Sequence, residues 1–119
     1  FVKELQPGQC VSYGRTFTAD HPMRVATVCV GYADGYPRCL SNKGEVLIGG
    51  KRCPIVGRIC MDQFMVAVDD SVKPGDEVIL MGRQGEGEIT LDEVAKTAGT
   101  IPHEITCDLK RIPRVFVEK

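Results

Sequence analysis

Three side chains of different chemistry alternate near the middle of the sequence. Arg58, Cys60 and Asp62 stand two residues apart within Pro54-Ile-Val-Gly-Arg-Ile-Cys-Met-Asp-Gln63. β-Branched residues flank them, and side chains two residues apart lie on the same face of a strand. The pattern therefore predicts a strand that presents a cation, a thiol and a carboxylate on one face, although a core strand with a solvated face also fits. The opposite face then carries the intervening residues Ile59, Met61 and Gln63.

Tyr13, within Val11-Ser-Tyr-Gly14, is the first candidate for acid–base chemistry. A phenol with a pKa near about 10 accepts a proton at neutral pH only where cations or hydrogen bonds favour its phenolate. Arg38 and Arg58 could supply positive charge, but the sequence does not place them near Tyr13. A strand aromatic whose hydroxyl group is hydrogen-bonded is the alternative interpretation.

The six cysteines show no pattern of a disulfide framework or a zinc site. They stand at positions 10, 29, 39, 53, 60 and 107, and no two have C-x-x-C spacing. The two histidines, His21 and His103, do not add to a zinc-site pattern, because no such cysteine pair stands near them. We therefore expect reduced, mostly buried thiols in a cytosolic protein and no metal site.

Short strand patterns separated by turn residues must position these groups. Alternating or β-branched runs predict strands over 2–5, 10–13, 24–31, 45–48, 51–56, 64–68, 76–81 and 114–118. The glycine pair at 49–50 predicts a hairpin, and 15–22 and 32–38 are predicted to be loops. In the strand at 114–118, Val115 and Val117 should share one face.

Two further segments have recognisable local signals. Gly82-Arg-Gln-Gly-Glu-Gly87 is rich in glycine, which is typical of both phosphate-binding loops and hairpin turns. Glu86 and Glu88 would repel a phosphate, so a hairpin turn is favoured. Thr90-Leu-Asp-Glu93 is a capping box, which predicts a helix over 91–98, and a second short helix is predicted over 100–107.

Together these elements predict a mainly β fold: an antiparallel, partly closed β-barrel-like domain with one or two short helices. A length of 119 residues fits a single domain over 1–119. The net charge of −1 and the absence of a long apolar run indicate neither a nucleic-acid partner nor a membrane partner. Because the chain begins mid-pattern without methionine, we expect a piece of a longer protein.

Three blocks, in this order, resemble the C-terminal domain of alanine racemase, a pyridoxal-phosphate enzyme. They are Val11-Ser-Tyr-Gly14, Gly31-Tyr-Ala-Asp-Gly-Tyr36 and Val56-Gly-Arg-Ile-Cys-Met-Asp-Gln63, with weaker matches at Lys73-Pro-Gly-Asp-Glu-Val78 and Arg111-Ile-Pro-Arg114. The resemblance implies a preceding α/β barrel, absent here, that holds pyridoxal phosphate through a lysine. It also implies L- and D-alanine as substrates and a cytoplasmic homodimer whose chains pack head to tail and share sites. The isolated chain should then be inactive.

The resemblance also implies roles for individual residues. Tyr13 matches the catalytic base for the L-enantiomer, and Met61 matches the residue whose backbone N–H meets the substrate carboxylate. The residues that match the substrate entrance and its surroundings are Tyr32, Arg38, Arg58, Cys60 and Asp62. Where the family often has a tyrosine near the cofactor phosphate, this sequence has Lys110, which could meet the phosphate as a point charge.

Two other functions remain open from the sequence. A racemase of the same fold could act on serine or on a broad range of amino acids. A stand-alone β-barrel binding module, such as an oligonucleotide-binding barrel, would need aromatic residues interleaved with a basic stripe. The aromatic residues are scattered here, and the basic cluster is limited to Lys110, Arg111 and Arg114, which argues against that module.

Overall fold

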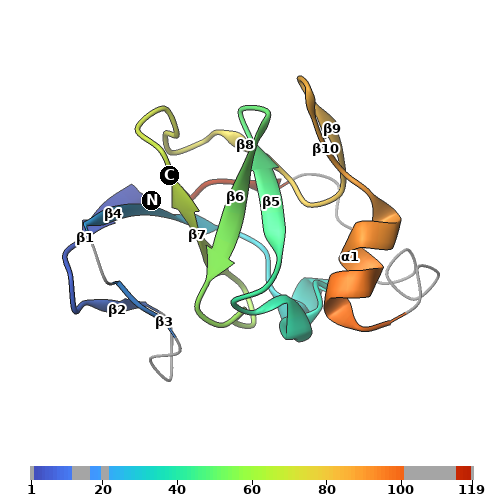
Figure 1. Ribbon diagram of the computed structural model, residues 1–119, viewed down its shortest axis with the longest axis horizontal. Coiled ribbons are helices and arrows are strands. Elements are labelled where there is room, and N and C mark those ends of the chain that lie inside the picture. Colours follow the sequence, from blue (N-terminus) through green and yellow to red (C-terminus); the bar gives the residue numbers. More distant parts are fainter. Residues whose placement is uncertain (1, 12–16, 20–21, 101–114, 119) are drawn as a thin grey trace.

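A computed structural model of the chain describes residues 2–11, 17–19, 22–100 and 115–118. Within these ranges short strands dominate (Figure 1). The strands are β1 (Val2–Leu5), β2 (Cys10–Val11), β3 (Phe17–Thr18), β4 (Met23–Val28), β5 (Glu45–Ile48), β6 (Lys51–Val56), β7 (Phe64–Val68), β8 (Glu77–Ile79), β9 (Gly82–Gln84), β10 (Gly87–Ile89) and β11 (Val115–Phe116). The helical elements are two 3₁₀ turns, η1 (Tyr32–Asp34) and η2 (Arg38–Leu40), and the α-helix α1 (Leu91–Ala98). None of the helices in these ranges is long and apolar enough to cross a membrane.

Seven of the described strands form one sheet that curls back on itself. Their spatial order is β1-β4-β7-β6-β5-β8-β11, and every neighbouring pair is antiparallel. β11 pairs with β8, and Val117 just beyond it bridges to Val28 of β4. The Glu118 amide extends this contact by donating to the Thr27 carbonyl oxygen at 2.8 Å. These contacts confirm the predicted antiparallel, partly closed β-barrel-like fold.

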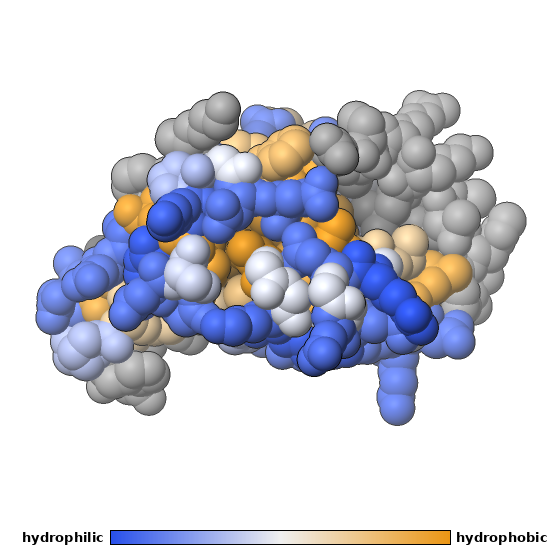
Figure 2. Space-filling view, turned by 90° about the horizontal axis from the view of Figure 1, so that it is seen from above, coloured by the Kyte–Doolittle hydropathy of each residue, from blue (hydrophilic) through white to orange (hydrophobic). Residues whose placement is uncertain are grey.

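The main core lies inside this curl. Tyr36, from the loop after η1, stacks on Phe64 of β7 with ring centroids 5.1 Å apart, and both side chains are almost fully buried. Figure 2 shows apolar residues in the middle of the face seen from above, surrounded by hydrophilic residues. Val115 and Val117 are buried whereas Phe116 between them is exposed, which confirms the predicted shared face. The core therefore joins the loop after η1 to the first residue of β7.

The opposite face of the sheet carries a second apolar cluster. Val25 of β4 and Ala67 of β7 belong to it, whereas their neighbours Ala26 and Val66 lie in the main core. A strand with apolar cover on both faces has a nearly continuous apolar sequence rather than an alternating one. This explains the clear strand pattern at 24–31, although β4 itself ends at Val28.

The predicted helix over 91–98 is confirmed, and Arg52 of β6 fastens it to the sheet. The Glu93 amide donates to Oγ1 of Thr90 at 3.1 Å, which is one of the two hydrogen bonds of a capping box. Both terminal nitrogens of Arg52 donate to the Glu93 carboxylate, and Nη2 lies 2.7 Å from Oε1. Nη2 also donates to the Glu88 carbonyl oxygen at 2.7 Å. One guanidinium group thus links β6, β10 and α1.

Glu93→Gln should lower stability at pH 7 but not in acid. The hydrogen bonds from Arg52 hold the pKa of the Glu93 carboxyl below its usual range. A lowered folded-state pKa stabilises the fold above the unfolded-state pKa of about 4.3, and this contribution disappears as the pH falls through the folded-state value. Because both side chains are partly exposed, we expect a loss of less than about 1 kcal/mol in urea denaturation at pH 7. The loss should shrink as the pH falls below the unfolded-state value.

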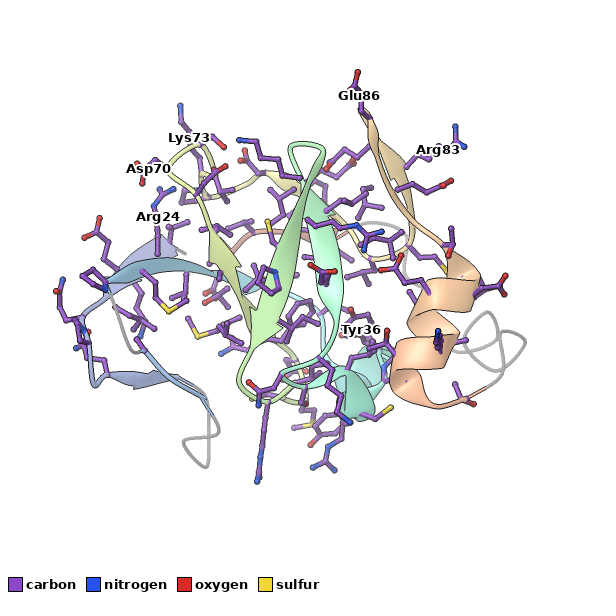
Figure 3. All side chains as sticks on the ribbon, in the orientation of Figure 1. Arg24, Tyr36, Asp70, Lys73, Arg83 and Glu86 are labelled. Atoms are coloured by element: carbon purple, nitrogen blue, oxygen red, sulfur yellow. The ribbon has the colours of Figure 1, made fainter. Side chains whose placement is uncertain are left out.

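Glu86→Gln is the matched control for this prediction. Glu86 is exposed at the tip between β9 and β10 and points outward (Figure 3). The same change of charge there should leave stability almost unchanged at both pH values. A Glu93→Gln effect of equal size at pH 7 and pH 3 would show that the ion pair does not contribute.

The glycine-rich segment after β8 is a hairpin, as its composition predicted. β9 and β10 pair antiparallel, with Gln84 opposite Gly87. The side chain of Gln84 is also used structurally, since its Oε1 accepts a hydrogen bond from the Gly50 amide at 3.0 Å. This segment therefore packs on the β5–β6 turn.

Three other expectations need correction or fall outside the described residues. The segment 15–22 is not simply a loop, because it contains β3, which pairs with β2. A strand of two residues is too short to show the alternation of side chains by which a strand is recognised in a sequence. Its hydrogen bonds come from the partner strand. The predicted loop over 32–38 is partly 3₁₀ helix. The predicted helix over 100–107 lies almost wholly outside the described residues.

The expectation of mostly buried thiols is wrong for the part of the chain that the structure describes. Cys29 and Cys39 are exposed, Cys60 is half-buried and Cys53 alone of these four is buried; all four are free thiols. A cysteine that occupies a loop or a strand end carries no signal of its exposure in the sequence.

Iodoacetamide at pH 8.5 should therefore alkylate Cys39 much faster than Cys53. Burial, together with the nearby Asp69 carboxylate, raises the pKa of the Cys53 thiol to about 11, and the thiolate is the reactive form. Peptide mass mapping over time would measure both rates, and unfolding in urea should bring them together. Equal rates in the folded protein would contradict the placement of Cys53.

Candidate functional site

The strand predicted to run through Arg58, Cys60 and Asp62 ends before it reaches them. β6 stops at Val56, and Gly57 has a φ of 80°, a left-handed conformation that turns the chain out of the sheet. The segment between Gly57 and β7 is a loop, which we call the Met61 loop (residues 58–63). The predicted alternation on one strand face is therefore wrong.

Ile59 and Met61 show how far the loop departs from a strand. In a strand both side chains would point the same way, but Ile59 is 2% exposed and Met61 is 52% exposed. Ile59 enters the core and anchors the loop, whereas Met61 faces solvent. The Cys60 amide closes the loop by donating to the Gln63 carbonyl oxygen at 2.9 Å.

The Met61 loop lies directly on η1. The amides of Tyr32 and Ala33 donate to the carbonyl oxygens of Cys60 and Met61, each at 3.0 Å. A Cβ atom at Gly31 would collide with the same two carbonyl oxygens, so the backbones approach more closely than any larger residue permits. Two sequence blocks that are far apart in the chain thus form one surface.

A hollow of about 220 Å³ opens where the two blocks meet. Its described lining is Tyr32, Arg38, Arg58, Ile59, Cys60 and Met61. The structure therefore brings together every described residue that the sequence singled out for a site except Asp62, which is exposed on the same loop. Ile59 was missed because an apolar residue in that pattern indicates only a strand interior.

The hollow has a positively charged, aromatic mouth. The Arg38 guanidinium carbon lies 5.1 Å from the centroid of the Tyr32 ring, a cation–π contact. Arg58 adds a second guanidinium group. Such a mouth attracts small anions such as carboxylates.

The Met61 amide is available to a ligand. The Met61 carbonyl is used by Ala33, but no described residue accepts a hydrogen bond from the Met61 N–H. A backbone N–H that has no acceptor among the described residues, on a loop that lines a hollow with two guanidinium groups, can donate to an anionic oxygen. The loop can therefore bind one end of a small carboxylate.

Two predicted site residues lie outside the described part of the chain. Tyr13 falls between β2 and β3 in the sequence, and Lys110 falls before β11. Their roles stay predictions, and the geometry above does not depend on them.

Residues 1–116 match the family described as alanine racemase, C-terminal domain. The chain belongs to this family. It is 53% identical over 118 residues to an alanine racemase from Symbiobacterium thermophilum, covering 97% of this chain and 31% of that protein. It is 54% identical over 120 residues to one from Cutibacterium acnes, covering 98% of this chain and 32% of that protein.

Solved alanine racemases share the fold of this family member. The enzyme from Bacillus anthracis with bound L-Ala-P superposes with a TM-score of 0.86 at 44% identity, covering 92% of this chain and 28% of that one. The enzyme from Bartonella henselae with covalently bound pyridoxal phosphate gives 0.81 at 40% identity, covering 91% and 30%. The chain thus spans less than a third of the length of these racemases.

The described lining of the hollow in this alanine racemase domain does not fit a covalent pyridoxal phosphate site. A Schiff base needs a lysine, and none of the described residues that line the hollow is a lysine. Lys51 of β6 instead forms an ion pair with Asp69 at 2.7 Å. What the hollow offers instead is two guanidinium groups, which suit a small carboxylate.

Proposed function

We propose that this chain is the C-terminal domain of an enzyme that interconverts L- and D-alanine with pyridoxal phosphate. Membership of the family and relatives named alanine racemase support this, and the chain spans only 31% and 32% of two of them. The cofactor-bearing α/β barrel then belongs to the remaining length. The single observation that carries the proposal is the exposed Met61 loop beside two guanidinium groups, because alanine must be held by its carboxylate.

In this proposal Tyr13 is the base on one side of the substrate. It removes the α-proton of the L-enantiomer, and a lysine of the barrel serves the D-enantiomer on the other side. Racemisation needs two groups on opposite sides of Cα, because one removes a proton and the other returns one to the far face. The cofactor, when bound, delocalises the negative charge left on Cα.

The described residues have the complementary task of admitting and holding the substrate. The Met61 N–H donates to the substrate carboxylate, and the side chain of Met61 needs only to pack against its surroundings. Arg38, Arg58 and Tyr32 form the entrance and guide the carboxylate towards the loop. A charge-assisted hydrogen bond to the carboxylate fixes the orientation of Cα relative to both bases.

The exposed face of the domain fits an assembly in which two chains share each site. Tyr32 and Met61 are 43% and 52% exposed, although large apolar side chains are normally buried. We assign this face to contact with the barrel of the partner chain in a head-to-tail homodimer. Free thiols at Cys29 and Cys39 fit a reducing compartment, so we place the enzyme in the cytoplasm.

Complementation between two inactive variants of the full-length protein tests this proposal. Mixing a Tyr13→Phe variant with a variant that lacks the barrel lysine should restore activity, because one site of the heterodimer regains both bases. The isolated chain, as a control, should neither racemise alanine nor retain pyridoxal phosphate after dialysis. Subunit exchange without restored activity would remove the shared site.

Comparing kcat/KM for alanine and serine tests the substrate in the same preparation. We expect alanine to be preferred, since the relatives are named for it. A higher kcat/KM for serine, or similar values for many amino acids, would favour the same-fold racemase of wider scope.

A further inference from the structure

Three residues outside the hollow fix the position of the Met61 loop, and the proposed function does not use them. They are Gly31, Ser41 and Asn42. Each touches the loop or the glycine before it, and none of them lines the hollow in the described part of the chain. Their contacts come from two separate turns, one next to η1 and one after η2.

Asn42 holds the point at which the chain leaves β6. Its side-chain Oδ1 accepts a hydrogen bond from the Gly57 backbone amide at 2.7 Å, and its backbone N–H donates to the Gly57 carbonyl oxygen at 3.1 Å. Asn42 has a φ of 58°, a left-handed conformation that few residues other than glycine, asparagine and aspartate adopt readily. This strain is sustained because the pairing with Gly57 compensates for it.

Ser41 connects the loop to the entrance arginine. Its hydroxyl donates to the Arg38 carbonyl oxygen at 2.6 Å and accepts from the Ile59 amide at 2.8 Å. The backbone of Ile59 is therefore tied to η2, which carries Arg38. A shift of this turn would move both sides of the hollow together.

Gly31 sets how closely the loop approaches η1. Its missing side chain lets the Tyr32 and Ala33 amides reach the carbonyl oxygens of Cys60 and Met61. The Asp34 carboxylate accepts a hydrogen bond from the Gly31 amide at 3.1 Å and so fixes the η1 turn. The loop is thus held at Met61 by η1, through the Met61 carbonyl oxygen, and just before its start by Asn42, through Gly57.

We infer that Gly31, Ser41 and Asn42 are positioning residues that hold the Met61 N–H in place for the substrate carboxylate. The inference rests on the proposed function and extends it to residues that do not touch the substrate. A hydrogen bond to an anion depends on placement to within a fraction of an ångström, and groups held in advance bind without the cost of ordering them. These three residues therefore contribute to carboxylate binding, beyond any contribution to stability.

The test uses the full-length holoenzyme and propionate, a carboxylate shaped like alanine without the amino group. Asn42→Gly tolerates the left-handed backbone but removes the acceptor for the Gly57 amide. We expect it to raise both the KM for alanine and the Ki for propionate by about tenfold, with a smaller change in kcat. Asn42→Asp keeps an acceptor and tolerates the same φ, so both constants should stay within about twofold of wild type. Gly31→Ala should raise both constants at least as much as Asn42→Gly.

Gly49→Ala is the matched control for loss of stability alone. Gly49 has a φ of 63° in the β5–β6 turn, and an added Cβ would meet nothing within 4 Å, so the cost is backbone strain far from the loop. It should lower Tm while KM and Ki stay at wild-type values. The inference is overturned if Asn42→Gly lowers Tm as Gly49→Ala does but leaves the Ki for propionate unchanged. If Gly31→Ala does not fold, Ser41→Ala takes its place as the second variant. A wild-type protein that fails to racemise alanine would overturn the proposed function and this inference with it.

Discussion

Tyr13→Phe in the full-length enzyme should slow racemisation by roughly 10²- to 10⁴-fold in both directions, the usual cost of removing a positioned acid–base group. Phenylalanine keeps the shape of the ring and removes only the hydroxyl group to which the proposed function assigns the proton transfer. In the proposed two-base mechanism both directions suffer, because each conversion uses one base to remove a proton and the other to deliver one. Initial rates from each enantiomer, followed by chiral chromatography, would measure the loss.

The assignment of Tyr13 to one enantiomer has a sharper consequence in hydrogen exchange. In deuterated water, the α-proton of D-alanine should still exchange, because the proposed function assigns it to a lysine of the barrel that this substitution leaves intact. Exchange of the α-proton of L-alanine should fall with the loss of racemisation. Proton nuclear magnetic resonance of the Cα position reports both rates in one experiment.

Tyr36→Phe is the matched control for this prediction. Tyr36 lies in the main core and stacks on Phe64, so phenylalanine preserves the contact that its ring makes. A near-isosteric change should leave racemisation within about twofold of wild type. Exchange of both enantiomers at equal rates in Tyr13→Phe would remove the assignment of Tyr13 as the L-specific base.

The elements of this fold that could be predicted are those determined by local sequence. The Gly49-Gly50 pair between two β-branched runs indicated the β5–β6 hairpin, and Thr90 with Glu93 marked the first turn of α1. Both signals lie within a few residues of the structure they specify, so a single sequence is enough to read them. β3 escaped prediction because its hydrogen bonds depend on β2 rather than on its own pattern.

The candidate site could be predicted as a set of residues but not as a shape. Arg58 and Cys60 alternate as they would in a strand, and nothing local shows that the strand has already ended. That ending depends on the left-handed φ of Gly57 and on its pairing with Asn42, which stands 15 residues earlier. The meeting of the Met61 loop with η1 depends on Gly31, and its place at the end of the predicted strand over 24–31 gives no sign of this contact. Long-range contacts of this kind leave no periodic trace in one sequence.

Phe64→Ala should remove about 3–5 kcal/mol of folding free energy, a large part of the roughly 5–15 kcal/mol typical of a domain. Phe64 is 1% exposed, and its ring stacks on Tyr36, so truncation leaves a cavity and an unsupported aromatic partner. The position matters beyond packing, since Phe64 directly follows the Met61 loop and Tyr36 follows η1. The stack therefore ties together the two segments that form the hollow.

Urea denaturation followed by circular dichroism would measure this loss, with Phe116→Ala as the matched control. Phe116 is 39% exposed in β11, so the same truncation there should cost only about 1 kcal/mol or less. If Phe64→Ala does not fold, Phe64→Leu fills most of the space and should still cost more than Phe116→Ala. Equal losses at the two phenylalanines would show that the Tyr36–Phe64 stack does not hold the core. The expected inequality instead follows directly from their burial, because only one of the two rings leaves a void when it is removed.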